Sequence, residues 1–347
     1  MGRWRVQINE VVLQTGQHRT MFPSSLRDRK TFVQTATKLR VRDINVRRRM
    51  KQRSKHILSG LAGMAGMAGT VWLGLFATLS ARQHRLIFNP IRVKEVERPR
   101  SASHRTRSIV LRSKDGTRLC GWLLTPKAPG PHPAAIYFGG RSEEVSWVAR
   151  DAGTMCPDMT VLVMNYRGYG DSDGIPAERH LVEDGQMLFD WLAEHRRVDP
   201  GRIAVIGRSL GSGVALQVAA QRPAAAAVLI TPYDSILAIA KRRFKTIPVS
   251  LVLRHRFESI KHASQVVGPV LVLRAENDSV IPRSHTDLLV SKLASVQVDQ
   301  TVPGSDHFNI PYLADTQQRI AGFLHARLFS AEQKVPAISS LLTLIGQ

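Results

Sequence analysis

A serine between glycines is the strongest chemical signal in this sequence. Ser209 lies in Gly207-Arg208-Ser209-Leu210-Gly211, after the apolar run Ile203 to Ile206 and at the start of a helical pattern, Gly211 to Gln221. A serine on such a tight strand-to-helix turn exposes its hydroxyl at a helix N-terminus, where backbone N–H groups favour developing negative charge. Glycine is required at the flanking positions because a Cβ there would collide with neighbouring backbone. The motif predicts a nucleophile; an ordinary glycine-rich connection is the alternative.

A serine hydroxyl is a poor nucleophile at neutral pH, so it needs a base and a carboxylate that orients the base. In this type of turn the chain order is serine, acid, histidine. Asp278 follows the predicted strand Val270 to Leu273, and His307 follows the last predicted strand, Val296 to Val302. We predict that His307 removes the serine proton and that Asp278 fixes the imidazole tautomer.

Three other carboxylates lie close to predicted strand ends: Glu276, Asp306 and Asp234. Asp278 is preferred because it occupies the tip of its loop, just before Val280-Ile281-Pro282, and Asp234 is the second choice. His325 is the other late histidine, but it should lie inside the final helix.

Backbone donors must stabilise the oxyanion of a tetrahedral intermediate. The N–H of Leu210 is the first expected donor. The second should come from the turn after the third predicted strand, Tyr137-Phe138-Gly139-Gly140-Arg141. We place it at Arg141, with Gly140 as the near alternative; a plain turn is the other interpretation of the two glycines.

These residues must be positioned by alternating strands and helices. Eight apolar runs are predicted strands: Arg107 to Leu111, Leu119 to Leu124, Ala134 to Phe138, Val161 to Asn165, Ile203 to Ile206, Ala227 to Ile230, Val270 to Leu273 and Val296 to Val302. Helical patterns cover Glu143 to Ala152, His180 to His195, Gly211 to Gln221, Ile236 to Arg243, Ser284 to Leu293 and Thr316 to Leu328. The pattern predicts an open, mostly parallel α/β sheet, with active groups at the carboxyl ends of its strands.

Together, these features resemble the α/β-hydrolase superfamily. The resemblance covers residues 82–328 and is closest to membrane-anchored serine hydrolases with little lid, which include lysophospholipases, protein depalmitoylases and relatives of serine aminopeptidases. Further stretches that carry it are Asn165-Tyr166-Arg167-Gly168-Tyr169-Gly170 with Ser172 and Gly174, Thr231-Pro232-Tyr233-Asp234-Ser235, and the apolar segment before Arg82 to Pro90. It implies an α/β-hydrolase fold with an eight-stranded, mostly parallel sheet and helices on both faces. One departure is the third-strand turn, which usually reads His-Gly-Asn and here reads Gly139-Gly140-Arg141.

Only 33 positions separate Tyr233 from Val266, where larger relatives insert a cap domain. A thinly covered site next to a membrane anchor suggests lipid-like or other amphipathic acyl esters as substrates.

The charge is concentrated in the N-terminal region. The chain of 347 residues has 49 Lys and Arg against 27 Asp and Glu, a net charge of +22, and residues 1–56 contain 15 of the bases but only three acids. We expect residues 1–56 to be a flexible basic leader, and Met50 is a second candidate start. A nucleic-acid-binding arm is disfavoured because no recognition module accompanies it.

From Ile57 to Ser80 the chain has no charged residue, and 24 helical residues would span roughly 36 Å against a hydrocarbon core of about 30 Å. We predict a transmembrane anchor at 57–80; a buried core helix and a cleaved signal are the alternatives. Seven Lys and Arg precede it and four follow within 15 residues, which places the N-terminus in the cytoplasm and the main domain on the outer or periplasmic side. This orientation disfavours a depalmitoylase.

The remaining segments are a connector at 81–105, the hydrolase domain at 106–329 and a C-terminal tail at 330–347. Two cysteines, Cys120 and Cys156, exclude a disulfide-rich scaffold and a CxxC site, and no metal or organic cofactor is implied. We predict a membrane-anchored serine hydrolase that cleaves a carboxylic ester or thioester. A peptidase or amidase with the same triad and a non-catalytic binding protein on the same fold are the alternatives.

Overall fold

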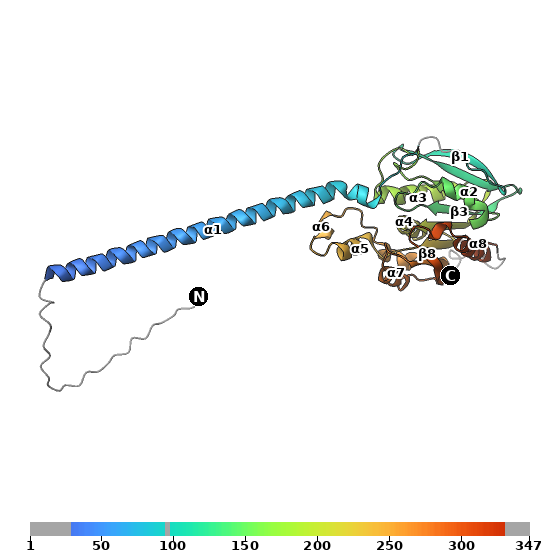
Figure 1. Ribbon diagram of the computed structural model, residues 1–347. Coiled ribbons are helices and arrows are strands. Elements are labelled where there is room, and N and C mark those ends of the chain that lie inside the picture. Colours follow the sequence, from blue (N-terminus) through green and yellow to red (C-terminus); the bar gives the residue numbers. More distant parts are fainter. Residues whose placement is uncertain (1–28, 94–97, 330–347) are drawn as a thin grey trace, which may run out of the picture. The chain divides into compact units, whose positions relative to one another are not determined.

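The computed structural model describes residues 29–93 and 98–329 of a chain that divides into two units, Met1–Gly74 and Leu75–Gln347 (Figure 1). In the first unit, all described residues belong to α1 (Arg29–Ile87). Residues 29–56 contain no glycine or proline and are rich in good helix formers, so the helix continues through them. The structure thus describes residues 29–56 as helix, where the sequence predicted a flexible leader, and residues 1–28 of that leader lie outside the described residues.

Within the described residues, α1 is the one helix long and apolar enough to cross a membrane. Large apolar side chains of its uncharged stretch are exposed; Leu58, Met64 and Leu73 are examples.

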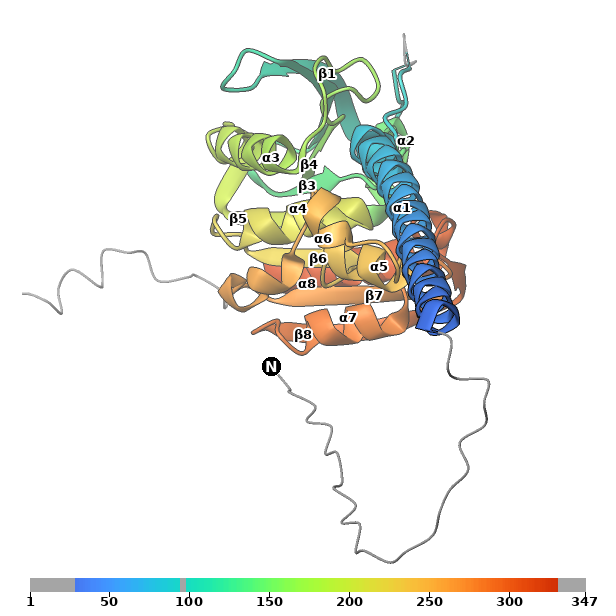
Figure 2. The ribbon, with the colours of Figure 1, turned by 90° about the vertical axis from the view of Figure 1, so that its left-hand side faces the viewer.

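The second unit contains the predicted sheet. Its strands are β1 (His104–Arg112), β2 (Arg118–Pro126), β3 (His132–Phe138), β4 (Thr160–Met164), β5 (Val198–Arg208), β6 (Ala226–Ile230), β7 (Val270–Asn277) and β8 (Val296–Asp306). The spatial order is β1-β2-β4-β3-β5-β6-β7-β8, from β1 at the top to β8 at the bottom of Figure 2. Only β2 pairs antiparallel with its neighbours, β1 and β4, so the prediction of eight mostly parallel strands is confirmed.

Helices cover both faces of the sheet. The long helices of this unit are α2 (Ser146–Met155), α3 (Glu178–Ala193), α4 (Leu210–Ala219), α5 (Ile236–Arg243), α7 (Arg283–Val290) and α8 (Ala314–Leu328). One apolar core lies under α3, α4 and α7, and a second lies under α2 and α8. Ile136 of β3 belongs to the first core and its neighbour Tyr137 to the second, as the alternation of side chains along a strand requires.

The segment between β6 and β7 contains only short helical elements. Besides α5 it contains α6 (Val249–Val252) and two short 3₁₀ turns, η2 (Ser259–Lys261) and η3 (Ala263–Gln265). It follows the carboxyl end of β6, so it borders the edge of the sheet where Ser209 lies.

Residues predicted as a connector belong to the folded unit. Phe88 is fully buried, and its ring packs edge-on against those of His255 and Phe257, with centroids 5.0 and 6.1 Å away. The described part of 81–105 is therefore integrated into the domain. Residues 94–97 and the predicted tail at 330–347 lie outside the described residues.

Candidate active site

Ser209 occupies a strained turn between β5 and α4. Its φ of 48° and ψ of −116° lie outside the regions that suit an L-residue. A Cβ at Gly211 would lie 2.1 Å from Phe138 O, and one at Gly207 would lie 2.4 Å from Gly211 O. The two glycines are thus required by close backbone approach, and the turn holds the serine hydroxyl where β5 ends.

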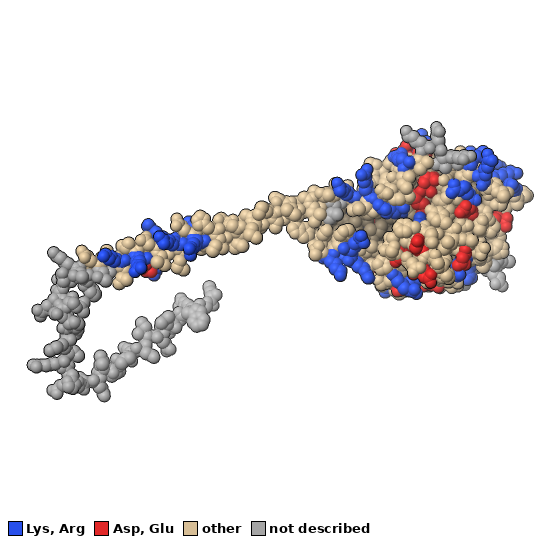
Figure 3. Space-filling view, in the orientation of Figure 1, with Lys and Arg blue, Asp and Glu red and all other residues tan. Residues whose placement is uncertain are grey.

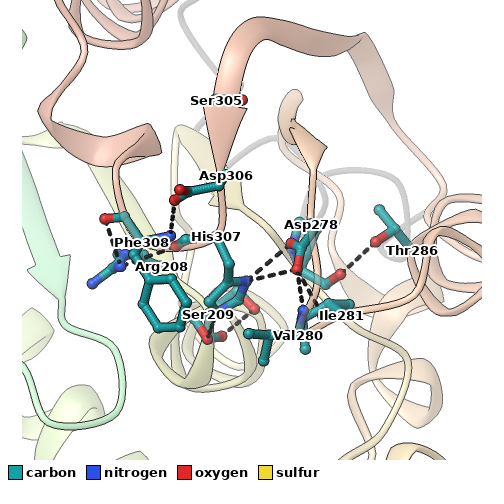
Figure 4. Close-up of polar contacts among 12 residues, drawn as sticks. Arg208, Ser209, Asp278, Val280, Ile281, Thr286, Ser305, Asp306, His307 and Phe308 are labelled. Carbon is teal, nitrogen blue, oxygen red and sulfur yellow. Dashed lines mark hydrogen bonds and ion pairs between the residues drawn. The ribbon is translucent and has the colours of Figure 1, made fainter.

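The structure brings Ser209, His307 and Asp278 into one hydrogen-bonded row (Figure 4). Ser209 Oγ lies 2.9 Å from His307 Nε2. On the other side of the ring, His307 Nδ1 lies 2.9 and 3.1 Å from the two carboxylate oxygens of Asp278. The Asp278 carboxylate is held in place by the N–H groups of Val280 and Ile281, at 2.9 and 2.7 Å.

Each rival carboxylate has a different partner. Glu276 accepts from Gly304 N at 2.8 Å, and Asp306 accepts from the N–H groups that follow His307, closing its turn. Asp234 lies 2.7 Å from Nδ1 of His285, and both side chains are buried. His325 is exposed on α8 and stacks on Phe329. Within the described chain, none of these four side chains hydrogen-bonds to Ser209 or His307.

The predicted backbone donors differ in how they are used. Leu210 is the first residue of α4, and Arg141 follows the turn after β3; the described residues include no hydrogen-bond acceptor for either N–H. The N–H of Gly140 instead donates to Glu143 Oε2 at 2.6 Å. Gly140 is therefore set aside as an oxyanion donor, because its N–H is already bound.

Glu143 is a central residue of the site that the sequence reasoning missed. Besides Gly140 N, its buried carboxylate accepts from Tyr137 Oη at 2.8 Å, Trp147 Nε1 at 2.9 Å and Arg208 Nη1 at 2.8 Å. The guanidinium of Arg208 also donates to the carbonyls of His307 and Phe308, at 3.1 and 3.2 Å. One ion pair therefore connects the β3 turn, the serine turn and the histidine loop. An acid three residues after Gly-Gly, together with an arginine directly before the serine, was the available signal.

Burial of Arg208 opposes its charge, but the neighbouring Glu143 carboxylate more than compensates, so the pKa of Arg208 lies above its ordinary value. Arg208 therefore stays charged, and within the described residues Glu143 is the one carboxylate that forms an ion pair with it.

The Arg141 side chain connects the β3 turn to the end of α1. Its Nε donates to Leu86 O at 2.9 Å and its Nη2 to Arg85 O at 3.3 Å, at the C-terminal turn of α1. The next residue, Ser142, donates its N–H to Phe88 O at 3.1 Å. The β3 turn is thus held by the end of α1 rather than by a histidine within the turn.

Two buried tyrosines from the family-like stretches fix the backbone around the site. Tyr166 Oη donates to Gly139 O at 3.0 Å, and Tyr233 Oη donates to Leu210 O at 3.2 Å. Burial raises the pKa of both phenols well above the ordinary value, so both remain donors.

No group of three or more His, Cys, Asp or Glu within the described ranges could hold a metal ion. Cys120 and Cys156 are both free and buried.

Comparisons with known proteins agree with this architecture. Residues 115–238 match the X-Pro dipeptidyl-peptidase (S15 family). An uncharacterized protein of Mycobacterium tuberculosis is 33% identical over 243 residues, covering 70% of this chain and 86% of the relative. A lysophosphatidylserine lipase of Danio rerio is 26% identical over 257 residues, 58% of this chain and 63% of the lipase. An acetyl xylan esterase from Paenibacillus sp. R4 superposes with a TM-score of 0.54 at 22% identity, over 75% of this chain and 94% of the esterase.

The sheet order, the serine turn and these similarities define the class. The chain belongs to the α/β-hydrolase superfamily of serine hydrolases, as its sequence predicted.

Proposed function

We propose that this hydrolase cleaves carboxylic esters or thioesters through an acyl-enzyme on Ser209. The observation that carries the proposal is the hydrogen-bonded row from Ser209 Oγ through His307 to Asp278. In the first step, His307 Nε2 takes the hydroxyl proton as Ser209 Oγ attacks the substrate carbonyl, and then gives it to the leaving alcohol or thiol. In the second step, His307 activates water, which cleaves the acyl-enzyme and restores the free serine.

The other groups stabilise charge in these steps. Asp278 keeps the proton of neutral His307 on Nδ1 and stabilises the imidazolium that forms. The N–H groups of Leu210 and Arg141 are the proposed oxyanion donors, and Glu143 with Arg208 positions the turns that carry them. Removing one such donor typically lowers kcat about 100-fold to 1,000-fold.

Amphipathic acyl esters are the proposed substrate class. Phe308, next to His307, is 64% exposed, and Val280, in the Asp278 loop, is 42% exposed. These apolar side chains would contact an acyl chain, and the β6–β7 segment is too short for a cap domain. A lysophosphatidylserine lipase among the relatives is consistent with this choice.

Residues 57–80 of α1 are the proposed membrane anchor, with the N-terminus in the cytoplasm and the hydrolase domain on the outer or periplasmic side. The proposal is supported by the uncharged, 24-residue apolar stretch and by the excess of bases before it.

Peptide or amide hydrolysis is the second candidate function, because residues 115–238 match a dipeptidyl-peptidase family. An aryl ester and an anilide with the same acyl group, assayed beside an X-Pro anilide, separate the two. Faster cleavage of the ester supports our proposal, and cleavage of only the X-Pro anilide contradicts it.

The direct test is labelling of the detergent-solubilised full chain with a fluorophosphonate probe. We expect wild-type protein to be labelled and Ser209→Ala and His307→Ala to remain unlabelled. Ser291→Ala, which removes an exposed hydroxyl on the far end of α7, is the matched control and should label normally. Absence of labelling in folded wild-type protein would refute the proposed chemistry.

A further inference from the structure

The segment between β6 and β7 carries an unusual concentration of positive charge. From Ser235 to Phe257 it contains no Asp or Glu and six bases, here called the basic lip: Lys241, Arg242, Arg243, Lys245, Arg254 and Arg256. All six are exposed, and no ion pair involves any of them within the described chain. Figure 3 shows blue side chains over the region of α5 and α6 without red ones among them. Cations kept without counter-ions on one surface favour an anionic partner.

The same surface exposes large apolar side chains. Leu251 of α6 is 75% exposed, and Phe244, which follows α5, is 36% exposed. Apolar side chains surrounded by Lys and Arg are typical of surfaces that bind at the boundary between lipid headgroups and acyl chains.

The basic lip lies where the apolar part of α1 ends. The Gln83 side chain accepts from Arg254 N at 2.9 Å and donates to Val252 O at 3.4 Å. Gln83 is only three residues beyond Ser80, the last residue of the uncharged stretch, a rise of about 5 Å along a helix. The headgroup layer on one side of a bilayer is itself roughly 5–8 Å thick. If residues 57–80 cross the membrane, α6 falls within that layer.

The basic lip also borders the site. α5 begins after the Thr231–Ser235 stretch at the carboxyl end of β6, and Arg242 Nη1 donates to Ser284 Oγ at 3.3 Å, near the loop of Asp278. A surface bound here would face the entrance to Ser209.

We propose that the basic lip is a docking surface for the anionic headgroups of the bilayer that holds α1, with Leu251 and Phe244 inserted among them. This inference rests on the proposed membrane anchor and names the source of the substrate: acyl lipids enter the site laterally from that surface.

The test uses the full chain in lipid nanodiscs. Leu251→Cys is labelled with an environment-sensitive NBD fluorophore, which is selective because both native cysteines are buried. We expect a blue shift of NBD emission in phosphatidylcholine–phosphatidylglycerol discs, a much smaller shift in pure phosphatidylcholine, and loss of the difference in high salt. Val267→Cys, 80% exposed just before β7 and so at the opposite edge of the sheet, should report water in both.

Charge reversal identifies the responsible side chains. Lys241→Glu with Arg243→Glu and Lys245→Glu should abolish the shift and lower hydrolysis of a disc-embedded lysophospholipid at least tenfold, with little effect on a water-soluble aryl ester. Arg105→Glu with Arg107→Glu and Lys114→Glu makes the same charge change on and beside β1 and should preserve both.

The inference is overturned if NBD emission at residue 251 shows a water-exposed label in anionic discs. It is also overturned if the chain does not enter the discs. Fluorophosphonate labelling of Ser209 in the same discs tests the proposed chemistry separately. Normal labelling together with a solvated residue 251 would refute only the docking surface. Absence of labelling together with a blue shift would refute only the hydrolase mechanism.

Discussion

Glu143 shows how a single buried carboxylate can order the loops of a candidate active site. It holds the N–H of Gly140 in the β3 turn and the guanidinium of Arg208 in the serine turn, and Arg208 in turn holds the carbonyl of His307. The β3 turn, the serine turn and the loop of His307 are therefore all connected through the Glu143 carboxylate.

We predict that Glu143→Gln lowers the free energy of unfolding by about 3–5 kcal/mol, because it leaves the Arg208 charge buried and unpaired. The rate of fluorophosphonate labelling should also fall at least tenfold in the protein that remains folded, as the β3 turn loosens. Labelling kinetics at a temperature well below the unfolding midpoint measure this effect.

Glu144→Gln is the matched control. Glu144 caps the start of α2 through Ser146 and accepts from Asn165, but contacts neither Gly140 nor Arg208. It should cost about 1 kcal/mol of stability and leave the labelling rate unchanged. Equal labelling rates in the two variants would show that Glu143 has only a structural role.

Gly211→Ala tests the close approach at the serine turn. The new Cβ would lie 2.1 and 2.4 Å from two backbone carbonyls, so the turn must shift, and we expect a loss of about 1–3 kcal/mol and strongly reduced labelling. Gly322→Ala on α8 meets nothing within 4 Å and should stabilise the helix by about 0.5–1 kcal/mol. Thermal unfolding of both variants measures these changes. A Gly211→Ala variant with the stability and labelling of wild type would contradict the packing argument.

At the scale of elements, the end of α1 is part of the site's support. Phe88 is buried, its carbonyl accepts from Ser142 N and Tyr169 Oη, and Arg141 binds the carbonyl of Leu86. The segment that follows the proposed anchor therefore holds the turn that carries the proposed oxyanion donor.

Two truncations separate anchoring from support. A chain that starts at residue 81 should remain folded and be labelled by the probe, whereas one that starts at residue 91 should lose about 3–5 kcal/mol from the missing Phe88 side chain alone. Labelling and thermal unfolding of the two proteins provide the comparison. Equal labelling and equal unfolding midpoints of the two proteins would mean that residues 81–90 do not support the site.

At the scale of the whole molecule, one buried and two half-buried histidines connect stability to pH. Burial lowers the pKa of His104 despite the opposing effects of Met159 O and Asp158, and burial likewise lowers those of His195 and His255. The folded state thus favours the neutral imidazole. Their stabilising contribution is complete above the unfolded pKa of about 6.5 and is lost as the pH falls below it.

We therefore expect the temperature of the unfolding midpoint to decrease as the pH is lowered from 8 to 5. The decrease should be smaller in His104→Gln. Gln keeps an uncharged donor near Met159 O, which His104 Nε2 contacts at 2.9 Å. His325→Gln, at an exposed position, makes the same replacement elsewhere in the chain and is measured beside it. An identical dependence in His104→Gln would exclude His104 as a source of the effect.

The sequence by itself determined the order of strands and helices and the serine turn, because apolar periodicity and glycine sterics act over a few neighbouring residues. It also indicated which strand ends carry Asp278 and His307, since parallel strands share one carboxyl edge. Only the tertiary structure decided that Asp234 pairs with His285 and that the N–H of Gly140 is bound by Glu143. The two hydrogen bonds join residues far apart in the chain or across a turn, and no local pattern specifies which acceptor a donor meets.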